Sequence, residues 1–105
     1  MFFYTVKCTF SGEHKHSVSD RWVKWLIEEH IADVVQGGAI GADIVKMDGD
    51  ALCYEIRYRF TGRNEFDLYE RDHAPRLREL GLTEFPLELG LSYERSSGEV
   101  ISTDN

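Results

Sequence analysis

Two segments of the sequence each place one histidine among apolar residues that recur with helical spacing. The first segment is WLIEEHIADVV, residues 25–35, and the second is YERDHAPRLREL, residues 69–80. At ~100° per residue, His30 and His73 fall in the middle of the apolar stripes of their helices. An imidazole titrates near neutral pH, so it can transfer a proton or hold a polar group of a ligand. If both helices pack on one sheet, both rings meet in one cleft, which predicts His30 and His73 as catalytic residues.

The same pattern has a structural interpretation, and the sequence leaves the choice open. A histidine on an apolar helix face is often a core residue whose ring bonds a tyrosine hydroxyl or an unpaired carbonyl. His73 lies two residues before Pro75, which has no N–H and leaves a carbonyl of the preceding turn unpaired. The stripe of His30 contains Trp22, Val23, Leu26, Ile27 and Val34, and that of His73 contains Phe66, Tyr69, Leu77 and Leu80.

Aromatic side chains and one arginine complete the predicted cleft. The predicted ligand-binding residues are Tyr54, Tyr58, Tyr69, Trp25 and Arg76. We expect the tyrosines to form walls and hydrogen-bond donors, because a phenol combines an apolar ring with a polar tip. The arginine borders the stripe of His73 and could hold a carboxylate. An ion pair with Asp72, one turn earlier, explains it equally well.

No residue pattern predicts a metal site. HKH at 14–16 puts two imidazoles on one side of a loop, but two ligands in a loop hold a metal poorly. Glu70 or Asp72 could complete a two-histidine, one-carboxylate set with His30 and His73, but both acids lie off the apolar stripe. We therefore expect no metal and no cofactor. Haem is the alternative, because one of the two histidines could serve as its axial ligand.

Periodicity and turn residues define the elements that carry these side chains. We expect strands over 2–10, 39–47, 51–60 and 87–94, helices over 20–36 and 64–80, and a turn at 48–50. The predicted helix caps are Ser19 and Asn64, and the predicted helix stops are Gly37 and Gly81. Pro75 predicts a kink over residues 71–74. Residues 1–95 would form one domain, with 96–105 as a tail that either adds a short strand or frays.

The order β-α-β-β-α-β is typical of an α+β, ferredoxin-like fold, with a four-stranded antiparallel sheet and two helices on one face. Right-handed crossovers put the first and third strands side by side at the centre of the sheet. Strand parity places Cys8 and Cys53 on opposite faces, so we expect both thiols to remain free. The face under the helices should carry Tyr4, Val6, Ile44, Tyr54, Ile56, Tyr58, Leu87, Leu89 and Leu91.

The other face of the sheet mixes apolar groups with charges of both signs. It should carry Phe3, Thr5, Lys7, Asp43, Val45, Met47, Glu55, Arg57, Arg59 and Glu88. We expect Arg57 and Arg59 to pair with acidic residues of this face. A self-complementary face suits a two-fold dimer in which two sheets close into a barrel. A sheet that is open to water on one side is the alternative.

Both helical segments also carry a resemblance. WVKWLIEEHIADVVQGG at 22–38, YERDHAPRLRELGL at 69–82 and EF at 84–85 resemble an uncharacterised family of short bacterial domains of unknown function. That family belongs to the dimeric α/β-barrel superfamily, and the resemblance covers nearly the whole chain. One departure is Ala32, where the family pattern usually has proline. The resemblance implies a homodimer with its helices outside, but no activity, because the superfamily holds monooxygenases, isomerases and ligand-binding proteins.

Charge and hydropathy limit the classes of partner. The chain has 19 Asp and Glu against 12 Lys and Arg, a net charge of −7, which repels a phosphate backbone and argues against nucleic acid. No run approaches ~18 apolar residues, and MFFYTVK lacks the basic start of a signal peptide. We therefore expect a cytoplasmic protein with no contact with a membrane.

These features predict a small homodimer with a helix–sheet cleft that binds a small, partly apolar molecule. Two alternatives remain open. The protein could be a small isomerase, or a cofactor-free or haem-dependent monooxygenase, that uses a cleft histidine as acid or base. It could instead be a purely structural or protein-interaction dimer, with both histidines saturated inside the core. A cavity that touches both rings would separate the first two readings from the third.

Overall fold

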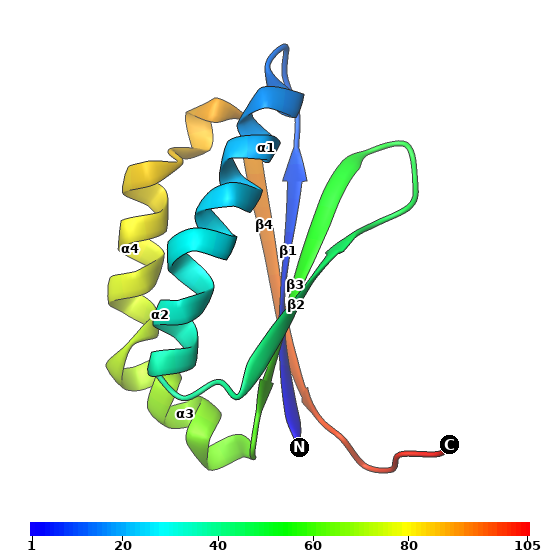
Figure 1. Cartoon of the computed structure of the whole chain (residues 1–105), viewed down its shortest axis with the longest axis vertical. Coiled ribbons are helices and arrows are strands. Elements are labelled where there is room, and N and C mark those ends of the chain that lie inside the picture. Colours follow the sequence, from blue (N-terminus) through cyan, green and yellow to red (C-terminus); the bar gives the residue numbers. More distant parts are fainter.

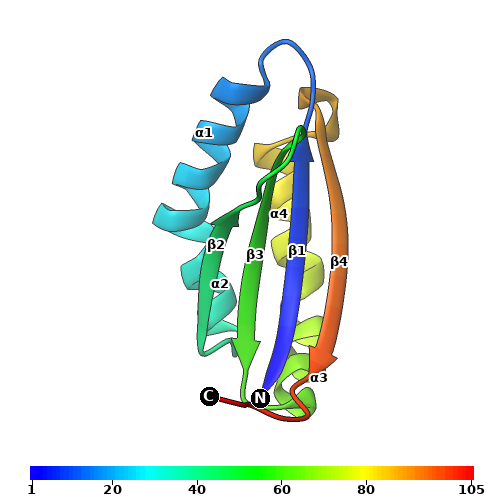
Figure 2. The ribbon, with the colours of Figure 1, turned by 90° about the vertical axis from the view of Figure 1, so that its right-hand side faces the viewer.

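A computed structural model describes residues 1–105, and it has the predicted order β-α-β-β-α-β. The sheet holds four strands in the order β2-β3-β1-β4, with antiparallel neighbours throughout. All helices lie on one side of the sheet, and the other side is uncovered (Figure 1, Figure 2). The elements are β1 (Phe2–Phe10), α1 (Lys15–Trp25), the π-helix η1 (Leu26–His30), α2 (Ile31–Gln36), β2 (Gly41–Lys46), β3 (Leu52–Phe60), α3 (Arg63–Asp72), α4 (Ala74–Glu84), the 3₁₀-helix η2 (Leu87–Leu89) and β4 (Leu91–Glu99).

The predicted pairing of the first and third strands at the centre of the sheet is confirmed. β1 and β3 pair over nine residues, with Tyr4 opposite Tyr58 and Val6 opposite Ile56. Since side chains alternate along a strand, these four side chains share one face. All four are buried under the helices. The pairing therefore fixes a row of two phenols and two aliphatic side chains beneath the helical layer.

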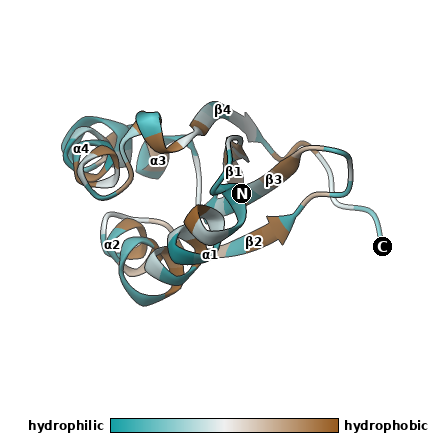
Figure 3. Ribbon diagram, turned by 90° about the horizontal axis from the view of Figure 1, so that it is seen from above, coloured by the Kyte–Doolittle hydropathy of each residue, from teal (hydrophilic) through white to brown (hydrophobic).

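Aromatic contacts join the two layers into one core. The rings of Tyr4 and Phe66 lie 5.1 Å apart, and the ring of Trp22 meets that of Phe10 edge-on at 5.2 Å. Such ring pairs stabilise a core beyond the burial of their area. Buried hydrophobic residues of both layers form this core, and Figure 3 shows hydrophobic positions along both the helices and the strands. None of the helices combines the length and the apolar character that crossing a membrane would require.

The first helical segment begins earlier than predicted and contains an irregular turn. It starts at Lys15, so Ser19 lies inside it as a buried residue whose hydroxyl donates to the carbonyl of His16 at 3.0 Å. The predicted cap at Ser19 was therefore wrong. The predicted end at Gln36 is confirmed. Between them, η1 adds one residue to a turn, with the N–H of Ile31 bonded to the carbonyl of Leu26.

The extra residue of η1 changes which side chains face the core. On an ideal α-helix Val34 would lie about 120° around the axis from Trp22. An i→i+5 turn delays the rotation, so Val34 returns to the same side. Trp22, Leu26 and Val34 are all buried, whereas Ile27 is 66% exposed. The expected place of Ile27 in the apolar stripe was therefore wrong.

The second helical segment is interrupted, as Pro75 predicted. α3 ends at Asp72 and α4 begins at Ala74, with His73 between them at φ −127°. The prediction of a stop at Gly81 was wrong, because α4 continues to Glu84. A side chain at Gly81 would meet the ring of Trp25 at 3.4 Å, so glycine here permits close helix packing. The segment also begins at Arg63 with Gly62 as its cap, in place of the predicted Asn64.

The last strand lies further along the chain than predicted. Leu87 and Leu89, expected under the helices, lie in η2 and are 51% and 38% exposed. Gly90 then adopts φ +100°, and its carbonyl accepts from the N–H of Ser11 at 2.9 Å. β4 starts only after this turn and runs to Glu99. Residues 96–99 of the predicted tail therefore pair with β1.

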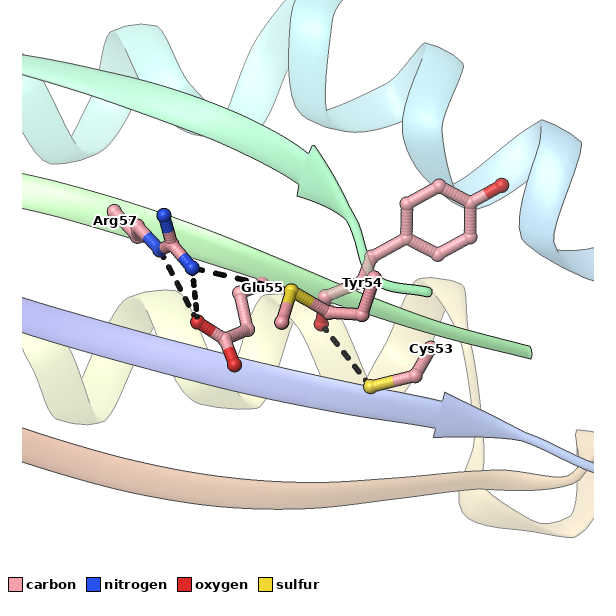
Figure 4. A network of polar contacts seen from close by, with 5 residues as sticks. Cys53, Tyr54, Glu55 and Arg57 are labelled. Atoms are coloured by element: carbon pink, nitrogen blue, oxygen red, sulfur yellow. Dashed lines mark hydrogen bonds and ion pairs between the residues drawn. The ribbon is translucent and has the colours of Figure 1, made fainter. Parts of the chain in front are cut away.

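The uncovered face of the sheet carries the expected mixture of charges. Arg59 donates to Asp43 at 2.7 Å, and Arg57 donates to Glu55 at 3.1 Å, so both arginines pair as predicted. Figure 4 shows Glu55 and Arg57 on this face, while the ring of Tyr54 points to the helix side. The two cysteines are free, with Cys8 under the helices and Cys53 on the opposite face. Glu88, expected on this face, lies in η2 instead.

Gly90→Ala should destabilise the protein more than Gly12→Ala, although both glycines have a positive φ. A Cβ at Gly90 would overlap the carbonyl oxygen of Ser11, whereas a Cβ at Gly12 would meet nothing within 4 Å. We expect a loss of about 3 kcal/mol in the free energy of unfolding for Gly90→Ala and about 1–2 kcal/mol for Gly12→Ala. Urea unfolding measures both, and equal losses would contradict the tight turn before β4.

Candidate functional site

A cavity of about 50 Å³ lies between the helices and the sheet, and we call it the helix–sheet cavity. Fifteen residues line it, eleven of them hydrophobic. Strands contribute Tyr4, Val6, Ile56, Tyr58, Tyr93 and Arg95. The helical side includes Trp22, Trp25, Leu26, His30, Arg78 and Leu82. Leu82 and Arg95 are exposed, so they form the rim of a cavity whose other walls are largely buried.

The hydroxyl of Tyr58 is the unusual feature of this cavity. Tyr58 is 1% exposed, and its hydroxyl has no hydrogen-bond partner. A buried polar atom without a partner costs about 1–3 kcal/mol, so such atoms are rare in folded proteins. Burial also raises the pKa of Tyr58 well above its usual range, which keeps the phenol protonated. The cavity therefore presents a buried neutral group that is able to donate a hydrogen bond.

Arg78 brings a second unpartnered donor to the wall. Its guanidinium donates to the hydroxyl of Tyr4 at 3.0 Å and to the carboxylate of Glu70 at 2.6 Å. Its Nε is buried and has no partner. An arginine Nε can only donate a hydrogen bond, so this atom requires an acceptor.

Arg95 lies at the rim, with its guanidinium 5.1 Å from the ring centre of Tyr93. It is placed on the helix-covered side of β4, opposite Val6 of β1. Arg95 forms no ion pair with a carboxylate, since the five salt bridges of the structure involve other residues. The positive charge of Arg95 lowers the pKa of Tyr58, Tyr69 and Tyr93 against the dominant effect of burial. Its field therefore reaches across the cavity.

His30 enters the cavity from η1. Its ring stacks on that of Trp25, with centroids 4.5 Å apart and planes 20° from parallel. Burial lowers the pKa of His30 to about 4, with Asp33 acting in the opposite direction and Arg95 adding to the decrease. The imidazole is therefore neutral at pH 7, so one ring nitrogen can accept a proton or a hydrogen bond. π-Helical turns occur often at functional sites, and here the turn carries the one histidine of the cavity.

The predicted convergence of His30 and His73 on one hollow was wrong. His73 lines a separate, polar cavity of about 120 Å³ with Asp33, Gln36, Gly37 and Arg76. The physical reason is the helix break before Pro75, because His73 leaves helical geometry there and its ring lies against Gly37. A guanidinium nitrogen of Arg76 lies 3.3 Å from Nδ1 of His73. The predicted pair of Arg76 with Asp72 is also absent, since Asp72 binds Arg71 at 2.8 Å.

Three of the five predicted ligand-binding residues line the helix–sheet cavity, namely Tyr58, Tyr69 and Trp25. Tyr54 does not, because it packs edge-on against Phe10 at 6.0 Å near the end of the strand. Arg76 belongs to the polar cavity of His73.

Sequence reasoning missed Arg78, Tyr93 and Arg95. Parity could have found the last two, because Leu91 was expected under the helices and residues 93 and 95 share its face. The hydroxyl of Tyr93 accepts from the indole N–H of Trp22 at 3.1 Å, which ties β4 to α1. No sequence signal distinguishes Arg78 from the other charged residues of α4.

The residues present do not favour a metal or a haem. No group of three or more His, Cys, Asp or Glu side chains is placed to hold a metal ion. A haem is far larger than a cavity of about 50 Å³, since pockets for drug-sized ligands already span roughly 300–1,000 Å³. The helix–sheet cavity therefore does not fit haem.

Sheet order, element order and the one-sided helical layer define a ferredoxin-like α+β domain. A dimeric ferredoxin-like protein from an uncultured marine organism has a TM-score of 0.72 at 13% identity, covering 100% of this chain and 99% of its own. A monooxygenase from the gene ActVA-Orf6 of Streptomyces coelicolor, in complex with Nanaomycin D, has a TM-score of 0.62 at 13% identity, covering 99% and 92%. MhuD with two manganese protoporphyrins bound has a TM-score of 0.56 at 7% identity, covering 98% of each chain. These likenesses show the fold.

Residues 1–91 match a domain of unknown function, DUF4286, and the chain belongs to that family. The resemblance of both helical segments to an uncharacterised family in the ferredoxin-like superfamily is therefore confirmed. A comparison with curated proteins gave no match to this sequence.

His30 should make the protein less stable in acid. A histidine of the unfolded chain titrates near 6.5, whereas His30 in the folded chain has a pKa of about 4. Between these values the unfolded chain binds a proton that the folded chain does not, so stability falls as the pH falls through this window. Between pH 7 and pH 4 the free energy of unfolding of His30→Gln should therefore fall by about 2–3 kcal/mol less than that of the wild type. His73→Gln is the control and should lose as much stability between pH 7 and pH 4 as the wild type. Urea unfolding at both pH values measures these losses. Equal losses for the wild type and His30→Gln would contradict the burial of the His30 ring.

Proposed function

We propose that the protein binds a small, partly apolar molecule in the helix–sheet cavity. The observation that carries this proposal is the hydroxyl of Tyr58, which is buried at the wall of the cavity without a hydrogen-bond partner. A ligand with one polar group would complete that bond, and eleven hydrophobic lining residues would contact its apolar part. Tyr69 and Trp25 would form part of those walls.

The size of the cavity limits the ligand. About 50 Å³ accommodates only a few heavy atoms, so a larger molecule requires the rim to open. The exposed rim residues Leu82 and Arg95 are the side chains that are free to move outward. Binding by rim movement is compatible with a fixed sheet wall, because Tyr58 lies on the central strand β3.

An enzymatic role for the same cavity is the second candidate. The imidazole of His30 lines the cavity and is neutral at pH 7, so it would take a proton from a bound molecule only if that molecule raised its pKa from about 4 toward neutrality. In such a role His30 acts alone, since His73 lines the other cavity. A ferredoxin-like monooxygenase with a bound ligand supports this candidate only through the shared fold. An isomerase or a cofactor-free monooxygenase would fit this arrangement.

We also propose that the chain forms a homodimer through the uncovered face of the sheet. That face carries Phe3, 38% exposed, together with the ion pairs of Arg57 and Arg59. Exposed apolar groups ringed by paired charges suit an interface in which a surface meets its own copy. The dimeric ferredoxin-like neighbour supports the homodimer, and the choice of face rests on Phe3 and these ion pairs. A purely structural or protein-interaction dimer remains the third candidate if the cavity binds nothing.

A cytoplasmic location is part of the proposal. Cys8 and Cys53 are both free, and they lie on opposite faces of the sheet. Burial raises the pKa of Cys8 to about 12, so this thiol is unreactive. Two buried thiols that do not pair suit a reducing compartment.

Tyr58→Phe should separate ligand binding from stability. The variant removes a hydroxyl that makes no bond in the folded protein, so we expect stability to stay equal or to rise by about 1 kcal/mol. A fragment screen monitored by thermal shift and by NMR should find ligands of the wild type that bind Tyr58→Phe about tenfold more weakly. Leu82→Trp, which fills the rim, should weaken the same ligands.

Tyr93→Phe is the matched control for stability, because Tyr93 lines the same cavity but its hydroxyl accepts a hydrogen bond from Trp22. It should lower the free energy of unfolding by about 1 kcal/mol. A screen in which every ligand binds wild type, Tyr58→Phe and Leu82→Trp equally would overturn the cavity as the binding site.

Phe3→Asp should dissociate the homodimer, since it places an unpaired charge on the proposed interface. Light scattering of the wild type should give twice the chain mass of 12.1 kDa, and Phe3→Asp should give the mass of one chain. Leu68→Asp is the control, because Leu68 is also exposed, at 50% against 38% for Phe3, but lies on α3, on the helical side. A monomeric wild type, or dissociation by Leu68→Asp alone, would contradict the sheet interface.

A further inference from the structure

The charges around the helix–sheet cavity are opposite to those of the whole chain. The chain carries a net charge of −7, with 19 acidic residues among 105. The lining of the cavity nevertheless contains two arginines, Arg78 and Arg95, and no aspartate or glutamate. Its histidine is neutral at pH 7. The cavity is therefore a positively charged hollow in an acidic protein.

We infer that the ligand of the helix–sheet cavity is a small organic acid, whose carboxylate is held by Arg95, Arg78 and the hydroxyl of Tyr58 while its apolar part lies among the aromatic walls. This inference rests on the proposed function and names the class of ligand. The inference is supported by the two donors without a partner on Tyr58 and Arg78, by the unpaired guanidinium of Arg95 and by the apolar walls of the cavity.

The two buried atoms without a partner are both able to donate. Nε of Arg78 can only donate a hydrogen bond, and the hydroxyl of Tyr58 can donate one. Both residues line the same cavity. A carboxylate only accepts hydrogen bonds and has about four lone-pair sites, so one such group could satisfy both donors. A ligand amide has a single acceptor oxygen with two lone pairs and no charge, so it would offer these donors fewer acceptor sites and would not balance Arg95.

Arg95 supplies a charge that the protein does not compensate. Arg78 shares its guanidinium with Glu70 at 2.6 Å, so its charge is largely balanced. Arg95 has no carboxylate within ion-pair distance, and the central carbon of its guanidinium lies over the ring of Tyr93, 5.1 Å from the ring centre. A planar guanidinium fits a carboxylate with two parallel hydrogen bonds. Arg95 at the rim would therefore attract an anion and close over it.

The walls restrict the rest of the ligand to a flat or short apolar group. Trp25 and His30 form a stacked pair on the helical side, and Ile56 and Val6 lie on the sheet side. These walls suit a short aliphatic chain in the closed cavity, and an aromatic ring would require the rim to open. The position of His30 also places its neutral ring beside the bound acid.

Matched acid and amide pairs test the charge preference on the full chain. The probes are acetate and acetamide, benzoate and benzamide, and phenylacetate and phenylacetamide, each titrated at pH 7 into ¹⁵N-labelled protein and followed by NMR. We expect at least one acid to bind about tenfold more tightly than its amide, with shifts at Tyr58 and Arg95, because hydrogen bonds to a charged acceptor are the stronger ones. Added salt should weaken the acid and leave the amide unchanged.

Variants of two arginines locate the effect. Arg95→Gln should weaken the acid about tenfold and change the amide less than about twofold, whereas Arg57→Gln on the uncovered face should change neither. Thermal unfolding of both variants confirms that they fold, and Arg95→Lys, which keeps the charge, should retain part of the affinity.

The outcomes separate this inference from the proposed function. If amides bind at Tyr58 as tightly as acids, or if Arg95→Gln weakens both equally, the carboxylate preference is overturned while the cavity remains a binding site. If no probe binds but the fragment screen finds a neutral ligand whose affinity depends on Tyr58, the carboxylate preference is again overturned and the cavity remains a binding site. If neither the probes nor the screen gives a ligand, both proposals are overturned.

Discussion

The hydroxyl of Tyr58 is held in the interior of the protein with no group to bond. The pairing of β1 and β3 fixes Tyr58 opposite Tyr4, and the helices cover both rings. The neighbouring polar groups are used elsewhere, since Tyr4 accepts from Arg78 and Tyr93 accepts from Trp22. A core under selection for stability alone would favour phenylalanine at such a position, because an unpartnered hydroxyl only costs free energy. The proposed ligand of the cavity would give this hydroxyl the partner that the folded chain does not supply.

The helical layer is built around the same hollow. η1 inserts one residue into the first helical segment, which brings His30 to the cavity while Trp22, Leu26 and Val34 remain in the core. Gly81 lets α4 approach Trp25, so the rim on that side stays narrow. The break at His73 turns the second histidine away. Two local irregularities thus decide which imidazole can meet a ligand.

The fold could be predicted well from the sequence because its signals are local and periodic. The alternation in residues 2–10 and 51–60 matches β1 and β3 within one residue, and their central pairing follows from handedness. The helix break near Pro75 also follows from one residue type. The start of β4 could not be predicted, because Leu87 and Leu89 alternate like strand residues, and what separates them from the sheet is the turn at Gly90, whose positive φ and close approach to Ser11 leave no periodic signal.

The site could be predicted only in part, for reasons that are geometric. A helical wheel assumes a constant rotation per residue, and both segments violate it, at η1 and at His73. The helical wheel therefore predicted two histidines in one cleft, whereas only His30 lines the helix–sheet cavity. Tyr58, Tyr69 and Trp25 were found because burial and strand parity do not depend on those irregularities. Arg78 and Arg95 were missed because a charged residue next to an apolar cavity has no periodic signal.

The most direct measurement is a crystal structure of the protein at a resolution that shows ordered solvent, with attention to the hydroxyl of Tyr58. The structure described above predicts a non-protein atom, from a water or a bound molecule, at about 2.7–2.8 Å from that oxygen inside the helix–sheet cavity. A Tyr58 hydroxyl bonded to a protein group, with side chains filling the space beside it, would contradict a ligand site at this position.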